Sequence, residues 1–468
     1  MSSKLVTEKS PRTVALVNLG CARNETDSEE LAGRLAADGW MLVDDPSKAE
    51  IAVINTCGFI ESAKKDSIDA LMQAHSLKEN GVTKAVVAVG CMAERYGNEL
   101  ANALPEADAI LGFDDYQDIS ARLSTIIDGG KISAHTPKDR RTLLPIAPSQ
   151  RAEQKAALKE ISPIGTVLRK RLDNSPISPL KIASGCDRRC SFCAIPYFRG
   201  SFVSRSPKEI VDEAKWLADN GVSELYLVSE NTTSYGKDFG DLKLMEKLLP
   251  QLSKIDAIKR IRLSYLQPAE VRPSLLQAMV SVEKVVPYFD LSFQHANGDL
   301  LRSMRRFGDG EKFLHLISQI RALAPEAGIR SNFIVGFPGE TDAQFMDLVE
   351  FLSQAQLDAI GVFGYSDEDK TEGMSLQNKV APEVIGERVA ELSTLVDELI
   401  SQRAEARVGE MVTVLIEDEE EQEGRADHQG PDVDGSTFIK SRNRYRIGEY
   451  VEAVVSDVSG VDLIAQVI

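Results

Sequence analysis

Residues 179–193 read PLKIASGCDRRCSFC, an apolar strand candidate that runs directly into three cysteines. Cys186, Cys190 and Cys193 are separated by three and then by two residues. Thiolates suit iron–sulfur clusters, and a four-iron cluster has four ligand positions, so three cysteines leave one iron open to a cofactor or substrate. A structural zinc site is the alternative. Such sites usually have two separated ligand pairs, and no fourth Cys or His follows at the expected spacing.

Strands and helices alternate from this stretch to about residue 407. Further strand candidates lie at residues 225–229, 260–266, 288–295, 328–338 and 358–366. Helix starts are predicted at Ser206, with Pro207 and Glu209, and at Thr341, with Gln344. Six strand–helix pairs predict a partial (βα)6 barrel, which is a TIM-type barrel two units short. The apolar stripe Phe313, Leu316, Ile317 and Ile320 has helical spacing and is predicted to be core, as is His295.

An earlier segment, residues 11–130, has the pattern of a parallel sheet with crossover helices. Its strand candidates are residues 13–20, 49–57, 84–91 and 107–112, and helices are predicted after Asn24, Phe59, Met92 and Asp114. The first three strands lead into Cys21, Cys57 and Cys91. Ligands of open parallel sheets gather at the carboxyl ends of the strands. The three thiols are therefore expected to converge although they lie far apart in the sequence.

The remaining segments complete an α/β protein with a small all-β end. Residues 131–175 lose periodicity and predict a linker, with a short helix in its Ala- and Lys-rich stretch. A long helix is predicted from residue 382 to residue 407. It is the last element of a predicted core domain that spans residues 176–407. Residues 408–468 predict a small β-barrel. From Gly409 onward this tail has 14 acidic and 5 basic residues, a net charge of −9.

Composition limits the class of protein. The 468 residues carry a formal charge of −18, 43% are hydrophobic and 27% are charged, which is ordinary for globular proteins. No apolar run approaches the 18 or so residues of a membrane span, and the polar start lacks the apolar stretch of a signal peptide. These features predict a cytoplasmic protein without a membrane partner, whose six cysteines are not read as disulfides.

The 186–193 motif resembles the signature of the radical S-adenosylmethionine enzymes. The contexts NLGCARNETDSE, NTCGFIESAKKDS and VGCMAERY around the first three cysteines resemble the amino-terminal domain of the methylthiotransferases, which holds a second cluster. Together with a tail resembling a TRAM domain, the resemblance covers nearly the whole chain. It implies an enzyme with two 4Fe-4S clusters and S-adenosylmethionine, each cluster bound by one cysteine triad, and no catalytic residue beyond the cysteines.

The same resemblance implies where S-adenosylmethionine binds. Phe192 would flank the adenosyl moiety, and Gly336, Gly339 and Glu340 would line its cleft. The glycines also fit a simple turn before the helix at Thr341. Many family members have Gln-Asp-Thr-Thr after the second barrel strand, whereas residues 230–233 here read Glu-Asn-Thr-Thr. The resemblance therefore assigns no polar role to Glu230 and Asn231.

Members of the family modify either an adenosine of transfer RNA or an aspartate of the small-subunit ribosomal protein numbered twelve. Sequences at residues 193–200, 293–295, 304–306, 364–366 and 431–435 resemble the ribosomal-protein branch. An acidic tail would repel RNA and attract a basic ribosomal protein. The implied partners are that ribosomal protein, a sulfur donor, and an electron donor such as flavodoxin or ferredoxin. The alternatives are a transfer-RNA methylthiotransferase and a non-catalytic iron–sulfur electron carrier or sensor.

Overall fold

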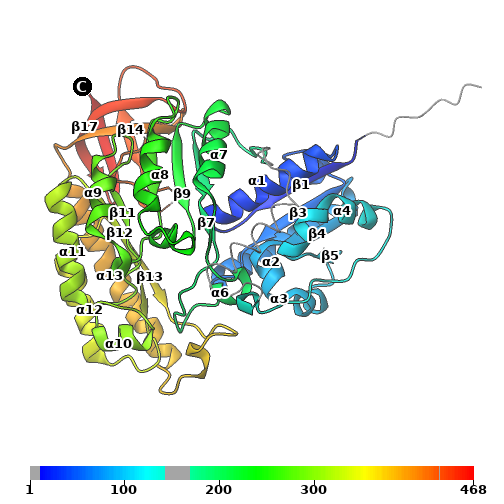
Figure 1. Ribbon diagram of the computed structural model, residues 1–468, viewed down its shortest axis with the longest axis horizontal. Helices are drawn as coiled ribbons and strands as arrows, with labels where there is room; N and C mark the ends of the chain where they lie inside the picture. Colours follow the sequence, from blue (N-terminus) through cyan, green and yellow to red (C-terminus); the bar gives the residue numbers. More distant parts are fainter. Residues whose placement is uncertain (1–10, 143–168, 432) are drawn as a thin grey trace, which may run out of the picture. The chain divides into compact units, whose positions relative to one another are not determined.

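The computed structural model describes residues 11–142, 169–431 and 433–468, and these residues divide into two units (Figure 1). The first unit comprises residues 11–142 together with residues 169–174, and the second comprises the described residues from 175 onward. No described helix is both long and apolar enough to cross a membrane.

The first unit is a parallel sheet covered by helices on both faces. Its elements are β1 (Thr13–Asn18), α1 (Ala22–Ala37), β2 (Met41–Leu42), β3 (Ile51–Thr56), α2 (Glu61–Asn80), β4 (Ala85–Val89), α3 (Gly90–Ala103), β5 (Ala109–Ile110) and α4 (Ile119–Ile127). The strand order is β2-β1-β3-β4-β5. One apolar core lies under α1 and α4, and a second lies under α2 and α3 on the other face. Strands β3 and β4 are buried at every position because both of their faces meet a helix.

Part of the predicted 131–175 linker packs on this first unit. Arg140 forms an ion pair with Glu94 at 2.5 Å, and Arg169 forms one with Glu29 of α1 at 2.5 Å. Both glutamates are almost fully buried, and a buried carboxylate is costly unless a cation pairs with it. These two arginines therefore tie their segments to the sheet. The short helix predicted in the Ala- and Lys-rich stretch lies outside the described residues.

The second unit contains six parallel strands in two groups of three, and a separate short antiparallel pair, β7 and β8. Its core elements are β6 (Ile177–Lys181), β7 (Ala183–Ser184), α6 (Ile195–Arg199), β8 (Val203–Ser204), α7 (Pro207–Asp219), β9 (Glu224–Val228), α8 (Leu244–Ser253), β10 (Arg260–Leu263), α9 (Pro273–Ser281), β11 (Tyr288–Asp290), α10 (Gly298–Ser303), α11 (Gly310–Leu323), β12 (Gly328–Val335), α12 (Asp342–Ala355), β13 (Ala359–Gly364) and α13 (Pro382–Glu405). Strands pair in the orders β10-β9-β6 and β11-β12-β13. Parallel bridges at Ile261–Val285 and Leu266–Leu291 join the two groups. The predicted partial barrel is thereby confirmed.

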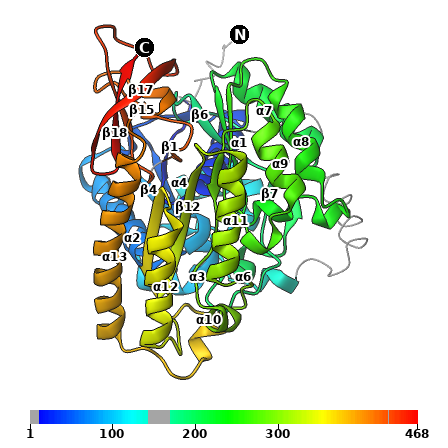
Figure 2. The same ribbon diagram turned by 90° about the vertical axis from the view of Figure 1, so that its left-hand side faces the viewer.

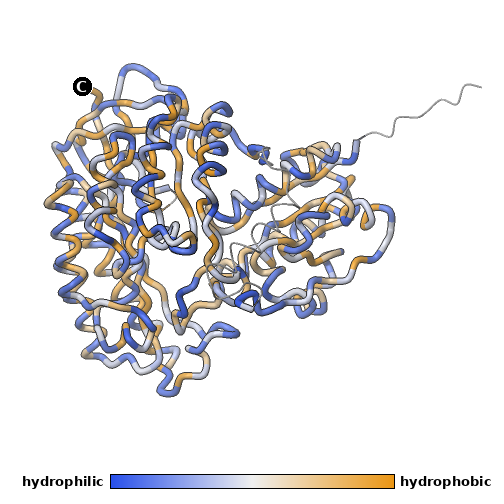
Figure 3. The backbone as a smooth tube through the Cα atoms, in the orientation of Figure 1, coloured by the Kyte–Doolittle hydropathy of each residue, from blue (hydrophilic) through white to orange (hydrophobic). Residues whose placement is uncertain are grey.

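Helices cover the outside of these strands. Figure 2 shows α11, α12 and α13 side by side, and neighbouring pairs among them are in contact. Their turns alternate between hydrophilic and hydrophobic in Figure 3, as expected for helices with one face on a core. The capping boxes predicted at Ser206 and Thr341 are both formed. The stripe from Phe313 to Ile320 lies in the core, and His295 is fully buried, as predicted.

A closed β-barrel ends the second unit. It consists of β14 (Met411–Asp418), β15 (Glu423–Arg425), β16 (Thr437–Lys440), β17 (Tyr450–Ser459) and β18 (Asp462–Val467), in the order β14-β15-β16-β18-β17. It meets the amino-terminal ends of the core strands. Arg260 at the start of β10 donates to Arg425 O at 3.1 Å, and Tyr288 at the start of β11 donates to Asp434 at 2.5 Å. The 186–193 cysteines follow the carboxyl end of β6, so the β-barrel and these cysteines lie at opposite ends of the core.

The structure differs from the predicted elements at short strands and helix starts. Strands β2, β7 and β8 have two residues each, too few to show a period of alternation. The helix predicted after Met92 begins earlier, at Gly90, whose φ of +90° permits the sharp turn out of β4. The helix predicted after Asp114 is a 3-10 helix at Phe113–Asp118 that continues as α4.

Candidate functional site: two cysteine triads

The cysteine loop, residues 186–193, begins just after β7. The antiparallel pair β7–β8 closes this segment, and Cys186 donates its backbone N–H to Gly200 O at 3.0 Å. Within the loop, Cys193 donates its N–H to Cys190 O at 3.1 Å. All three thiols are half-buried. The local backbone therefore gathers the three cysteines on one short, pinned loop.

The thiols of this loop influence each other's protonation. Burial raises the pKa of the Cys186 thiol, and the nearby Cys193 and Cys190 thiols raise it further. The backbone N–H of Arg188, which donates to Cys186 Sγ at 3.4 Å, acts in the opposite direction. Because thiols bind iron as thiolates, metal loading here would release protons.

The donor set of the cysteine loop suits a four-iron cluster. Within residues 11–142, 169–431 and 433–468, no three His, Cys, Asp or Glu side chains converge closely enough to hold one metal ion. Cysteines that bind a cluster are each attached to a different iron, so they need not converge as the ligands of one zinc ion do. Three half-buried thiols on one loop are thus suited to a four-iron cluster with one open position.

The turn after the second barrel strand supports the cysteine loop through Glu270. Asn231 Nδ2 donates to Glu270 at 2.9 Å, and Arg188 forms an ion pair with the same carboxylate at 2.6 Å. Burial alone would raise the pKa of Glu270, but the hydrogen bond from Asn231 and the charge of Arg188 hold it below its ordinary value. The Glu230 side chain is buried, and its carboxylate lies 3.6 Å from Arg199 Nε. Asn231 therefore positions a charged support of the loop.

The turn after β12 contains three of the residues expected at the S-adenosylmethionine cleft. Gly336 and Gly339 have φ values of +76° and +88°, which favour glycine. The Glu340 carboxylate accepts hydrogen bonds from Gly336 N–H and from Arg388 at 2.7 Å, and it lies 2.9 Å from His295 Nε2. Glu340 thus holds the turn from its buried side. Cofactor contact by the two glycines stays a prediction.

Phe192, the remaining residue expected at that cleft, lies between two of the cysteines. Its side chain is partly buried and packs against the main core of the second unit. A ring fixed in this way could present one face to a ligand bound at the loop. That contact also stays a prediction.

The first triad lies at the ends of three neighbouring strands. Cys21 precedes α1, Cys57 follows β3, and Cys91 lies in the first turn of α3. A Cβ on Gly20 would lie 2.8 Å from the Cβ of Cys57, so the first two loops touch. Cys91 Sγ donates to Asn24 Oδ1 at 3.4 Å, so the third loop contacts the first one as well. The loops after β1 and β3 lie where the strand order reverses, the usual ligand position in open parallel sheets, and the loop after β4 is the next one along the sheet.

Asn24 connects the three loops, and we expect N24A to disturb the first triad alone. Its amide donates to Leu19 O at 2.9 Å and to Thr56 O at 3.2 Å, so alanine removes a hydrogen bond from each of two carbonyls, at a cost of about 1–3 kcal/mol. Iron content after anaerobic reconstitution should fall by up to about half, since the change affects one of the two clusters that the resemblance implies. N98A, an exposed asparagine of the same unit, is the matched control. Full iron loading and unchanged thermal stability of N24A would contradict this role.

Three family models match the chain. Residues 13–112 match the uncharacterized protein family UPF0004, residues 180–352 match the radical SAM superfamily, and residues 408–468 match the TRAM domain. Each cysteine triad lies inside one matched segment.

Curated relatives match over nearly the full length. The ribosomal protein uS12 methylthiotransferase RimO of Streptomyces coelicolor is 58% identical, with 97% of this chain and 96% of the relative covered. The RimO protein of Kineococcus radiotolerans is 56% identical, with 98% of both covered. The chain belongs to the RimO family. Its two cysteine triads are thus features of a RimO-family protein.

Solved structures resemble this RimO-family chain in fold alone. The radical S-adenosylmethionine methyltransferase TsrM from Kitasatospora setae, solved with cobalamin and a [4Fe-4S] cluster, has a TM-score of 0.57 and 15% identity. The match covers 78% of this chain and 77% of that one.

Sequence reasoning missed the residues that support the triads. Asn24 and Arg306 lie in stretches that resemble the family, but the sequence assigned them no supporting role, and Glu270 lies in no such stretch. Arg306 Nη1 lies 3.8 Å from Cys190 Sγ, across 116 positions of the RimO-family sequence. The position of Asn24 three residues after Cys21 was a local signal. The other two contacts depend on tertiary structure.

Proposed function

We propose that this chain is a radical S-adenosylmethionine methylthiotransferase that adds a methylthio group to the β-carbon of an aspartate of ribosomal protein uS12. The observation that carries the proposal is 58% identity across 97% of the chain to proteins named for this activity, with both cysteine triads at strand ends of a suitable fold. Ribosomal proteins are made in the cytoplasm, so we place the reaction there.

Each cysteine triad has its own part in the proposal. Cys186, Cys190 and Cys193 would hold the cluster that binds S-adenosylmethionine, and Cys21, Cys57 and Cys91 would hold a second 4Fe-4S cluster. When bound, these groups supply a radical that removes hydrogen from an unactivated carbon and the sulfur that replaces it. A sulfur source and a one-electron donor such as flavodoxin or ferredoxin are required as partners.

Residues of the chain orient these groups. The ion pair between Arg188 and Glu270 fixes the middle of the cysteine loop, and the Glu340 network fixes the turn that bears Gly336. Glu340 is buried and the Arg188–Glu270 pair is half-buried, so the loop and turn are held in place before a ligand binds. Pre-organised backbone at these two places would position S-adenosylmethionine relative to the open iron.

Mass spectrometry of cells that lack this chain tests the substrate. We expect uS12 to lose one methylthio mass increment, and transfer RNA to keep its own methylthio groups. Re-expression of the wild-type chain should restore the modification of uS12. The opposite pattern, with transfer RNA altered and uS12 unchanged, would assign the chain to the transfer-RNA alternative.

An exposed acidic patch is suited to attract a basic ribosomal protein. We define it as Asp418, Glu419, Glu420 and Glu421, which are all exposed at the end of β14 and on its connection to β15. Glu417 does not belong to it, because its carboxylate lies 2.7 Å from Arg425. The patch lies on the β-barrel, at the opposite end of the core from the cysteine loop. It is therefore expected to act on association rather than on chemistry.

Reversing three charges of the patch should weaken the encounter with uS12. In E419K/E420K/E421K we expect the KM for uS12 to rise several-fold to about tenfold with kcat nearly unchanged, because rim charges chiefly alter association rates. Asp418 is kept, since its carboxylate accepts the N–H groups of Glu420 and Glu421. The matched control is reversal of the exposed Glu383, Glu387 and Glu391 on α13. An unchanged KM, or an equal effect in the control, would show that the patch has no such role.

A further inference from the structure

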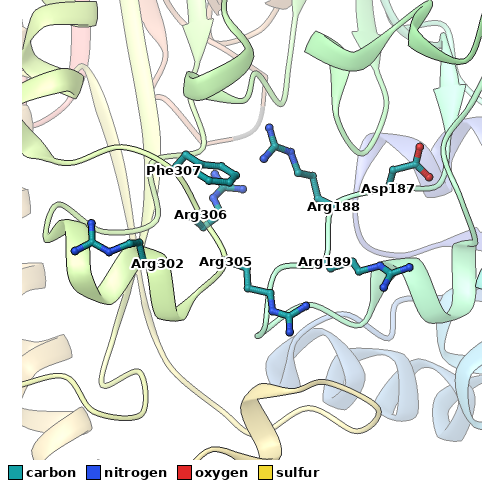
Figure 4. A pocket seen from close by; sticks show the side chains of 7 residues that line it. All are labelled: Asp187, Arg188, Arg189, Arg302, Arg305, Arg306 and Phe307. Atoms are coloured by element: carbon teal, nitrogen blue, oxygen red, sulfur yellow. The ribbon is translucent and has the colours of Figure 1, made fainter.

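A pocket lined by arginines opens beside the cysteine loop (Figure 4). Its lining, here called the arginine pocket, consists of Asp187, Arg188, Arg189, Arg302, Arg305, Arg306 and Phe307. Two short segments supply it: the cysteine loop itself, and α10 with the residues just after it. Figure 4 shows Arg188 and Phe307 facing each other across the opening, with the Arg188 guanidinium 6.0 Å from the ring centre.

The base of the arginine pocket touches the cluster ligands directly. Arg306 Nη1 lies 3.8 Å from Cys190 Sγ, and the backbone N–H of Arg188 donates to Cys186 Sγ at 3.4 Å. Arg306 is buried, and its other guanidinium nitrogen donates to Ser292 O. A molecule seated in the pocket would therefore lie one side chain away from a cysteine of the proposed cluster.

The pocket is positive although the chain carries a net charge of −18. Arg188 pairs with Glu270 and Arg305 pairs with Glu372, each at 2.6 Å. Arg302 pairs with Asp299. In the described part of the chain, Arg189 and Arg306 have no carboxylate partner among the ion pairs. Asp187 is the one acidic residue of the lining. This surface therefore favours an acidic partner.

An exposed aromatic ring lies among these charges. The side chain of Phe307 is 68% exposed, the largest fraction for any phenylalanine in the described ranges. Arginine and aromatic residues are the types most enriched at the centres of protein interfaces. An exposed ring surrounded by guanidinium groups thus indicates a surface that binds protein.

We propose that the arginine pocket is the docking surface of a small acidic electron-carrier protein. The inference rests on the proposed function, because that chemistry requires a reductant. In the step, one electron leaves the reduced carrier and enters the cluster held by Cys186, Cys190 and Cys193. The carrier is oxidised by one electron, and no covalent bond is made or broken. RNA, the other acidic class, is disfavoured because the basic surface is a single pocket at a metal-ligand loop rather than a track along a backbone.

The test compares a protein reductant with a small one. The variant R302E/R305E changes two exposed arginines outside the cysteine loop, and K254E/K259E makes the same charge change at exposed lysines near the start of β10, at the opposite end of the strands. Cleavage of S-adenosylmethionine by the reconstituted holoenzyme is driven by reduced flavodoxin or by dithionite. We expect R302E/R305E to raise the KM for flavodoxin about tenfold or more, and the control to change it little.

Dithionite separates docking from chemistry. Dithionite-driven cleavage should stay within about twofold of wild type in both variants, and the flavodoxin KM of wild type should rise with salt because exposed charges are screened. F307A, which leaves every charge in place, should also raise the flavodoxin KM. An unchanged flavodoxin KM in R302E/R305E and F307A would overturn the docking surface. Weakened RNA binding in R302E/R305E with an unchanged flavodoxin KM would assign the surface to RNA. Absence of dithionite-driven cleavage in wild type would instead reject the proposed function itself.

Discussion

C190A is expected to abolish cleavage of S-adenosylmethionine, while C57A leaves cleavage intact. Cys190 belongs to the loop proposed to hold a cluster with one open iron, and Cys57 belongs to the triad on the parallel sheet of the other unit. Each variant should lose about half of the iron bound after anaerobic reconstitution, because each removes one ligand of one cluster. C190A should release no deoxyadenosine. C57A should release deoxyadenosine and form no methylthio product, which separates radical formation from sulfur transfer.

The two variants act as controls for each other, since both remove one half-buried or buried thiol. Iron content is measured chemically, deoxyadenosine by chromatography, and the product by the mass of uS12. Methylthio product at an undiminished rate in C57A would reject the assignment of the first triad. Zinc in place of iron after anaerobic purification and reconstitution would reject both assignments.

E224A is expected to lower the free energy of unfolding of the second unit by about 3–5 kcal/mol, the usual effect of removing one partner of a buried ion network. Glu224 at the start of β9 is fully buried, with Arg262 at 2.9 Å, Arg260 at 3.3 Å and Arg425 at 3.5 Å. Arg425 comes from the β-barrel, and the other two come from β10. Alanine would leave three buried guanidinium groups without their shared carboxylate. Chemical denaturation checks the change, and E421A, at an exposed site of the same unit, should stay within about 0.5 kcal/mol of wild type.

The same carboxylate predicts a pH dependence. Burial alone would raise the pKa of Glu224, but the charges of Arg425, Arg262 and Arg260 lower it from 4.5 to about 2. A group whose pKa is lower in the folded state stabilises that state above the unfolded pKa, and the benefit disappears as the pH falls through the folded value. The stability difference between wild type and E224Q should therefore be constant at neutral pH and narrow from about pH 4.5 toward pH 2. A difference that does not change with pH would contradict this account.

The buried charges around Glu224 also join the β-barrel to the core of the second unit. Five closed strands of about 60 residues could be a separate module, yet Glu224, Arg260 and Arg425 join them to the core through buried charges. Some acidic residues that were counted in the net charge of the tail contact the core at this junction. Asp427 pairs with Arg260 of β10 at 2.6 Å, and Asp434 lies 3.5 Å from Arg330 of β12. Two acidic residues of the tail are therefore paired with cations of the core and are not available to an outside partner.

The sequence by itself predicted the fold class, which the structure confirms, and it placed the six cysteines in two groups of three, whose role as cluster ligands stays a prediction. Parallel strands need crossover helices, so the alternation of short β-branched runs with amphipathic ones was enough to predict the sheet and the (βα)6 barrel. The spacing of Cys186, Cys190 and Cys193 was informative because one loop holds all three. The strand-end positions of Cys21 and Cys57 were informative because parallel strands bring their carboxyl ends to one edge.

Only the tertiary structure decided which polar residues support those cysteines and which charges remain free. Arg306 lies 116 positions from Cys190, and Glu224 lies far from Arg425 in the sequence, so no local period connects them. Ion pairs depend on distances of a few ångströms between side chains from different elements, and packing sets those distances. For the same reason a count of charged residues could not separate the buried Glu224 network from the exposed Glu419, or locate the arginine pocket in an acidic chain.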